Sequence, residues 1–368
     1  MNNMTPENRL SVVFFTPDIA DNSLGRTYCL WLLAQSLGWN VAVVSTKGDR
    51  VWPPLADTPI SDDCFVLREE DLATHDLLRE ADLFIAVKPL TDSFGVAERL
   101  SHRLDKPLLL DIDDPDLEAQ LSWARPLRRA AKGVLRRSRI QEIKRLVRRT
   151  RSVPHIVSNP VLQARYGGPI IPHIRVDPGR GALHVSRTPS IAFVGSNRPH
   201  KGVDLLRAAV ERVQDLGYTL TVTDTAPADA RSWETWTGST SIEGGLSIVS
   251  GADIVVIPSL DVPFAHGQLP AKLMDAMFMG RAIVVSSIEP MPWALAGTGL
   301  TIQPGSVQAI ESALRELADP DLRSNLGNSA REHAIRTFGR SPSDATLDKC
   351  AQAAIDDYQH IKLRRPAG

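Results

Sequence analysis

A pair of cations follows a short apolar run in the second half of the chain. Arg198 and Lys201 come after the run Ile191 to Val194 and after Gly195, and Lys201 is followed by Gly202 and an apolar helical pattern. Arginine binds phosphate oxygens as a planar fork, and lysine binds them as a point charge. Both could stabilise the negative charge on a departing diphosphate, so we interpret them as catalytic candidates. The alternative is a pair of solvated cations before a helix.

A polar loop in the first half has the position of an anion-binding turn. Asn22 and Gly25 lie between the first predicted strand, Ser11 to Thr16, and a helical pattern that begins at Arg26. Backbone amides at such a helix start attract anions. The loop lacks the glycine spacing of a dinucleotide fingerprint, which argues against a nicotinamide cofactor. The alternative is that Gly25 only forms a tight turn.

Carboxylates cluster at the end of another predicted strand, in the run Asp111 to Pro115. Asp113 and Asp114 are candidates that could bind a substrate hydroxyl, act as a base or hold a metal. The alternative is that they cap the next helix and face solvent. His173, near the expected domain boundary, is a further candidate.

Length and pattern predict the elements that position these residues. The chain has 368 residues, 43% of them hydrophobic and 23% charged, which is enough for two globular domains. Short apolar runs alternate with helical patterns, as parallel sheets covered by helices require. The predicted strands are Ser11 to Thr16, Val41 to Ser45, Leu83 to Val87, Leu108 to Ile112, His155 to Ser158, Ser190 to Val194, Thr219 to Thr223, Ile254 to Pro258 and Ile283 to Ser286.

This pattern predicts an α/β chain with two Rossmann-like, doubly wound parallel-sheet domains that face an interdomain cleft. We expect an N-terminal domain over 1–180, a C-terminal domain over 181–342, and a helix and tail over 343–368 that pack back toward the first domain. The stretch Pro178 to Pro189 has no apolar periodicity, and we interpret it as an exposed linker.

Three stretches of the second half occur in the order and spacing of one enzyme family. They are Ile191 to Gly202, Ala252 to Ser259, and Pro270 to Val284, whose start compares with the pattern Pro-x-Lys-Leu-x-Glu-Ala-Met. The chain therefore resembles the retaining glycosyltransferases of family 4, also called glycosyl transferases group 1. The resemblance implies the GT-B fold and the transfer of a sugar from a nucleoside diphosphate to an acceptor.

The resemblance also implies roles for single residues. Arg198 and Lys201 would contact the diphosphate, Asp275 would bind the donor ribose, and the loop from Asn22 to Arg26 would close from the other domain. The other donor-side candidates are Gly195, Gly25, Asn22, His266, Gly267, Gln268 and Leu269. The N-terminal domain would bind the acceptor, with Asp113, Asp114 and His173 as acceptor-side candidates, and the C-terminal domain would bind the donor. Transfer would retain the anomeric configuration and need neither a cofactor nor a metal. Lipid-linked or polysaccharide precursors are the expected acceptors.

One departure from the family pattern leaves other functions open. The family carries two glutamates eight positions apart; Asp275 stands at the second position and Gly267 at the first. Glycine cannot hold a donor sugar as glutamate would, so His266 or Gln268 would have to serve. The alternatives are a GT-B sugar-nucleotide epimerase and a catalytically weak partner subunit that binds nucleotide sugars.

A basic segment and the cysteines indicate where in the cell the protein acts. Arg125 to Arg151 contains twelve Lys or Arg and one acid, Glu142, in a chain whose net charge is −1. Its apolar residues recur near helical spacing, which favours reversible docking at an anionic membrane surface, with a solvated helix face as the alternative. No aromatic residues interleave, which argues against nucleic acid. The three dispersed cysteines indicate a cytoplasmic protein without disulfides or a zinc site.

Overall fold

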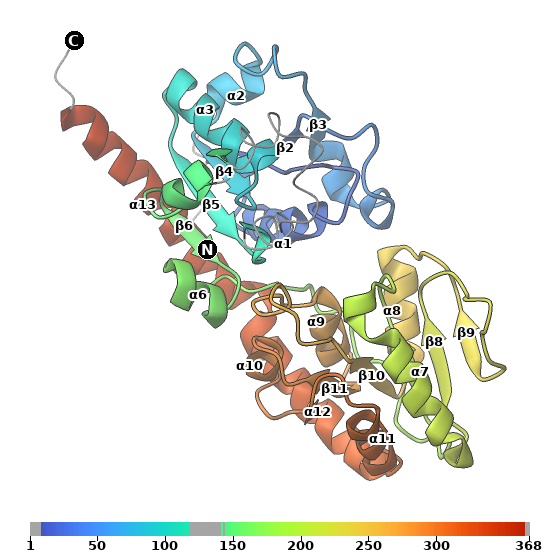
Figure 1. Cartoon of the computed structure of the whole chain (residues 1–368). Helices are drawn as coiled ribbons and strands as arrows, with labels where there is room; N and C mark the ends of the chain where they lie inside the picture. Colours follow the sequence, from blue (N-terminus) through green and yellow to red (C-terminus); the bar gives the residue numbers. More distant parts are fainter. Residues whose placement is uncertain (1–8, 118–140, 143, 365–368) are drawn as a thin grey trace. The chain divides into compact units, whose positions relative to one another are not determined.

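The computed structural model of the chain describes residues 9–117, 141–142 and 144–364 (Figure 1). These residues form two compact units. Unit 1 contains the described residues up to Pro172 together with those from Arg340 onward, and unit 2 runs from His173 to Gly339. The predicted domain bounds differ from these limits by a few residues, and the chain passes between the units at two places.

Unit 1 is built on a six-stranded parallel sheet, sheet A, with the order β3-β2-β1-β4-β5-β6. Its strands are β1 (Ser11–Phe15), β2 (Asn40–Ser45), β3 (Cys64–Val66), β4 (Leu83–Val87), β5 (Leu108–Ile112) and β6 (His155–Val157). Its helices include α1 (Leu24–Ser36), α2 (Asp76–Glu80), α3 (Val96–Leu104), α6 (Pro160–Tyr166) and α13 (Arg340–Arg364). Every residue of β4 and β5 is buried, as expected for a parallel sheet with both faces covered.

Unit 2 repeats this architecture with sheet B, in the order β12-β11-β10-β7-β8-β9. Its strands are β7 (Ser190–Phe193), β8 (Thr219–Val222), β9 (Glu234–Trp236), β10 (Ile254–Ile257), β11 (Ala282–Ser286) and β12 (Leu300–Ile302). Its helices include α7 (Val203–Arg212), α8 (Ile242–Gly251), α9 (Ala271–Phe278), α10 (Met291–Leu295), α11 (Val307–Glu316) and α12 (Pro320–Phe338).

Alternation along β10 explains why sheet B has a core on each face. Val255 and Ile257 belong to one apolar cluster, and Ile254 and Val256 belong to another. Successive side chains of a strand point to opposite faces, so an unbroken apolar run supplies both cores. The two-unit α/β architecture expected from the sequence is confirmed.

The last helix, α13, packs within unit 1. It contains most of the helix and tail predicted over 343–368. Leu347, Ala351 and Ala354 are buried at helical spacing, and Ser36 of α1 donates a hydrogen bond to Asp344 at 2.6 Å. This packing stabilises a helix whose own sequence is mostly polar.

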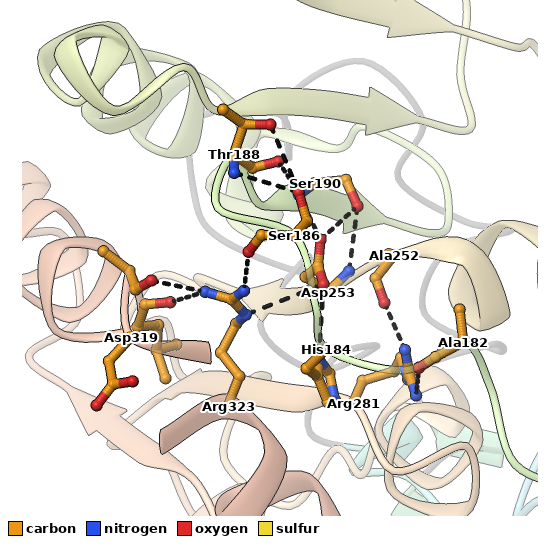
Figure 2. Close-up of polar contacts among 12 residues, drawn as sticks. Ala182, His184, Ser186, Thr188, Ser190, Ala252, Asp253, Arg281, Asp319 and Arg323 are labelled. Carbon is orange, nitrogen blue, oxygen red and sulfur yellow. Dashed lines mark hydrogen bonds and ion pairs between the residues drawn. The ribbon is translucent and has the colours of Figure 1, made fainter. Parts of the chain in front are cut away.

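Two buried arginines fasten the start of unit 2 to its sheet (Figure 2). Arg281 donates to the carbonyl oxygens of Ala182 and Ala252 at 2.7 and 2.8 Å, and Arg323 donates to the carbonyl oxygen of Ser186. His184 is only 8% exposed. The predicted exposed linker is therefore partly wrong, because buried guanidinium groups can satisfy the carbonyls of a chain that has no regular partner.

An internal ion pair joins three segments of unit 1. Arg26, in the first turn of α1, donates two hydrogen bonds to Asp111 of β5, at 2.7 and 3.0 Å, and both side chains are at most 1% exposed. Arg26 also donates to the carbonyl oxygens of Ile171 and Pro172. The predicted loop to Arg26 is thus shorter than expected, since α1 already begins at Leu24.

We expect Arg26→Met to lower the free energy of unfolding by about 3–5 kcal/mol, because it leaves the Asp111 carboxylate buried without its partner. The double variant Arg26→Met/Asp111→Leu should recover part of that loss. As a control, Lys47→Met removes the exposed pair with Asp92 and should cost under about 1 kcal/mol. Urea denaturation followed by circular dichroism measures all three, and equal losses for Arg26→Met and Lys47→Met would refute the role of the buried pair.

Candidate functional site

The candidate site begins where β7 ends. Gly195 has φ +126°, and its amide donates to the hydroxyl of Thr223 at 2.7 Å. A Cβ atom added at Gly195 would lie 3.3 Å from the Nζ atom of Lys272. The ammonium group therefore lies close to the backbone of Gly195, at the edge where parallel sheets bind ligands.

The loop after Gly195 is fixed against the end of β10. A short 3-10 helix, Pro199–Lys201, is closed by Gly202 in the left-handed conformation, at φ +72°. A Cβ atom at Gly202 would overlap the carbonyl oxygen of Pro258, and the amide of Leu260 donates to the carbonyl oxygen of His200 at 2.8 Å. Two backbone contacts therefore place Lys201 at the carboxyl edge of sheet B.

Three cations converge on one imidazole. The pKa of His200 falls to about 4, first because the ring is partly buried, and then because Lys201, Arg198 and Lys272 add positive charge around it. The ring packs edge-on against Phe264, with 5.0 Å between ring centroids. His200 is therefore neutral at physiological pH and adds no charge to the cations. Sequence reasoning did not identify His200, which stands between the two predicted cations.

Lys272 is a third cation of the site. The sequence analysis included it in the stretch Pro270 to Val284 but assigned it no role. It lies in the first turn of α9, and its Nζ atom is 3.7 Å from the centroid of the Phe193 ring. Burial, followed by the charge of Lys201, holds its pKa well below the usual value of 10.5. Lys272 thus lies beside Gly195 at the end of β7, on the same helix as Asp275.

Asp275, the predicted ribose ligand, is held by an arginine. The Nε atom of Arg175 donates to the Asp275 carboxylate at 2.6 Å, and each side chain is about one fifth exposed, at 21% and 20%. The Arg175 amide donates to the carbonyl oxygen of Phe338 at 3.1 Å. This partner lies a hundred positions earlier in the chain, so no local motif could reveal it.

The loop before α9 contains the other donor-side candidates. His266 contacts the carboxylate of Asp261 at 2.6 Å. The Gly267 amide donates to the carbonyl oxygen of Glu289 at 3.0 Å, and Gly267 has φ +101°. Leu269 is 3% exposed and packs in a core of unit 2, whereas Gln268 is half-buried. Leu269 can therefore offer a ligand only its backbone.

The acidic candidates lie in unit 1, around one lysine. The Nζ atom of Lys88 lies 2.9 Å from Asp113 and 3.0 Å from both Asp114 and Asp116. Lys88 follows β4 in the left-handed conformation, at φ +69°. Burial raises the pKa of Asp116 to about 7, although Lys88 opposes this shift. The carboxylates gather closely enough to suit a cation, and the lysine ammonium supplies that positive charge.

The remaining candidates are distributed over both units. Asn22 is exposed, and Gly25 lies within the first turn of α1, where its amide donates to the carbonyl oxygen of Asn22 at 3.2 Å. His173 is 7% exposed and is the first residue of unit 2. The structure thus brings together Gly195, Arg198 and Lys201, whereas Asn22, Gly25, Asp113 and Asp114 belong to the other unit.

Part of the second half of the chain matches the model of one protein family. Residues 188–319 match the family model described as glycosyl transferases group 1. This match covers the strand of Gly195, both predicted cations and Asp275. No curated protein sequence matches the chain.

Solved structures share the whole architecture at low sequence identity. HepE of Anabaena, in complex with UDP-glucose, is 13% identical with a TM-score of 0.71, covering 93% of this chain and 99% of that one. Sucrose-phosphate synthase of Thermosynechococcus elongatus is 15% identical with a TM-score of 0.61, covering 95% and 100%. WaaG, a glycosyltransferase involved in lipopolysaccharide biosynthesis, is 14% identical with a TM-score of 0.61, covering 92% and 99%. The chain has the GT-B fold.

We expect Gly202→Ala to destabilise unit 2 more than Gly238→Ala. Both glycines have φ +72°, so both variants pay about 1–2 kcal/mol for the left-handed conformation. Only Gly202 meets a backbone carbonyl, since nothing lies within 4 Å of a Cβ atom at Gly238. The overlap should add about 1–3 kcal/mol.

Urea denaturation measures this difference, and hydrogen exchange of the Leu260 amide should be faster in Gly202→Ala alone. Equal losses of stability with unchanged exchange at Leu260 would show that the contact with Pro258 does not hold the loop.

Proposed function

We propose that the chain is a glycosyltransferase whose nucleoside diphosphate sugar binds unit 2 at the carboxyl edge of sheet B. The observation that carries the proposal is the convergence of Arg198, Lys201 and Lys272 on the neutral His200. Cations gathered at a strand end repel one another, and a bound diphosphate relieves that repulsion. The family match over 188–319 and the UDP-glucose complex of HepE support this substrate class.

In the proposed reaction, the bond between the sugar and the β-phosphate oxygen breaks, and the nucleoside diphosphate leaves with the electron pair. A new bond forms to an acceptor oxygen, which releases its proton. Arg198 and Lys201 stabilise the charge that develops on the leaving diphosphate. Retention of configuration and independence from a metal are further parts of the proposal, supported by the resemblance to family 4.

Asp275 is the proposed ribose ligand, and Arg175 is its positioning residue. The carboxylate has two oxygens, and the Nε atom of Arg175 donates to Oδ1. A ribose hydroxyl can donate to the second oxygen without displacing the arginine. Arg175 thus compensates for a side chain one methylene shorter than glutamate, because it fixes the direction of the carboxylate.

Turnover with a panel of nucleotide sugars tests the proposal. Arg198→Ala and Lys201→Ala should each lower kcat/KM by roughly two orders of magnitude, the loss expected for one transition-state charge stabiliser. Arg212→Ala is the matched control, because Arg212 is an exposed cation of unit 2 that pairs with Glu311 on α11; its turnover should be unchanged. A chelator should leave wild-type turnover intact.

The outcomes separate the three candidate functions. Interconversion of the nucleotide sugar without transfer would identify an epimerase, and binding without turnover would identify a partner subunit in which Gly267 replaces a needed acid. Wild-type turnover that equals that of Arg198→Ala and Lys201→Ala would remove both cations from the site.

We also propose that the basic segment docks at an anionic membrane surface and so keeps the enzyme near lipid-linked acceptors. Residues 118–140 and 143 lie outside the described part of the chain. In the described part, Lys144 and Arg148 are exposed, while Arg145 and Arg149 contact the buried Glu98 at 3.5 and 2.5 Å. Two of the arginines therefore stabilise unit 1, and the others supply the attraction. Among the described residues, no helix is long and apolar enough to cross a bilayer.

We expect the protein to sediment with vesicles that contain acidic lipid at low salt, and to be released at high salt because ions screen the attraction. The variant Arg136→Gln/Arg137→Gln/Lys144→Gln/Arg148→Gln should lose this association and keep its thermal stability. The control Arg198→Gln/Arg212→Gln removes two cations of unit 2 and should still sediment. Wild type that ignores acidic vesicles at low salt would refute the docking proposal.

A further inference from the structure

The ammonium group of Lys272 lies over an aromatic ring. Its Nζ atom lies 3.7 Å from the centroid of the Phe193 ring, and no hydrogen bond or ion pair to it is found among the described residues. Such a contact contributes about 0.5–2 kcal/mol, less than the cost of taking an ammonium group out of water. The positive charge of Lys201 repels the ammonium group. The folded protein therefore holds Lys272 at an electrostatic cost.

The ammonium group of Lys272 lies against the backbone at the end of β7. Gly195 has no side chain, and an added Cβ atom there would already lie 3.3 Å from the Nζ atom. Lys201 comes from the loop that follows Gly195, and its charge acts on both Lys272 and His200. Lys272 therefore approaches the end of β7 from the α9 side. A diphosphate between the two lysines would meet cations on two sides.

We propose that Lys272 is a third ligand of the donor diphosphate, beside Gly195, and that it takes up a proton when the diphosphate binds. This inference rests on the proposed function and adds to it a coupling between donor binding and pH. Lys272 would give the site a charge that follows its ligand.

The proton uptake follows from electrostatics. In the free protein, burial and Lys201 lower the pKa of Lys272, so the neutral amine is populated at a lower pH than in a free lysine. A bound anion favours the charged form and raises the pKa again. Between the two pKa values, binding therefore takes up a proton, and affinity falls as the pH rises through that window.

Calorimetric titration with UDP, GDP and ADP tests the proposal at pH 8.5, where the terminal phosphate is fully ionised because its pKa is about 6. Runs in two buffers of different ionisation enthalpy give the number of protons taken up. For the nucleotide that binds the wild type, we expect a net uptake of protons. Lys272→Met should abolish this uptake and weaken binding about 10- to 100-fold, as expected for a lost charged contact.

Lys272→Arg provides the decisive comparison. A guanidinium group stays charged at this pH, so the variant should bind the nucleotide without proton uptake. Lys201→Met provides a second comparison: it removes the other lysine and should weaken binding, and because burial still lowers the pKa of Lys272, proton uptake should be reduced but not abolished. Thermal unfolding checks that the variants fold, and if Lys272→Met does not, the Lys272→Arg result still decides.

Unchanged affinity in Lys272→Met, or equal proton uptake in wild type and Lys272→Arg, would overturn the proposal and leave the proposed function standing. If none of the three nucleotides binds the wild type, both fail. A structural role for Lys272 against Phe193 predicts altered stability with unchanged proton uptake, which would also overturn the proposal.

Discussion

Gly202 and Pro258 come into backbone contact at the carboxyl edge of sheet B, and the candidate site depends on that contact. Any side chain at Gly202 would overlap the Pro258 carbonyl oxygen, so only glycine lets the loop after β7 reach the end of β10. The hydrogen bond from the Leu260 amide to the His200 carbonyl oxygen also joins this loop to the segment after β10. Arg198 and Lys201 gain a defined position from these contacts, because a charged side chain can act on a ligand only from a fixed backbone.

The site holds charges that repel one another. Positive charge gathers around His200 and keeps its imidazole neutral, and the charge of Lys201 lowers the pKa of Lys272. Such an arrangement reduces stability in the free protein and gives binding energy to an anion, which is a common compromise at functional sites. The core of unit 1 shows the opposite solution, because Arg26 and Asp111 neutralise each other where no ligand can reach.

The predicted strands agree with the structure where a strand is central and fully buried, as in β4, β5 and β10. The sequence analysis missed β3, β9 and β12, which are edge strands of three residues each. Three residues are too few to show a period, and an edge strand needs fewer apolar residues because one side lacks a neighbour. The linker prediction failed at His184 for a related reason, since the arginines that bury this stretch are Arg281 and Arg323, far along the chain.

The sequence by itself determined the two-unit parallel architecture, the carboxyl edge of sheet B as the place of the cations, and the candidates Arg198, Lys201 and Asp275. Apolar periodicity and short motifs are local, so they can be recognised without the fold. Only the tertiary structure decided which groups surround these candidates. Arg175 pairs with Asp275, which lies a hundred residues later in the chain. Lys88, which follows β4, pairs with Asp113 and Asp114, which follow β5. Lys272 lies beside Gly195 only because the fold brings the end of β7 next to α9. Segments that are remote in sequence come into contact only when the sheets form. The distances, burial and charges that result determine the pKa values and contacts of the site.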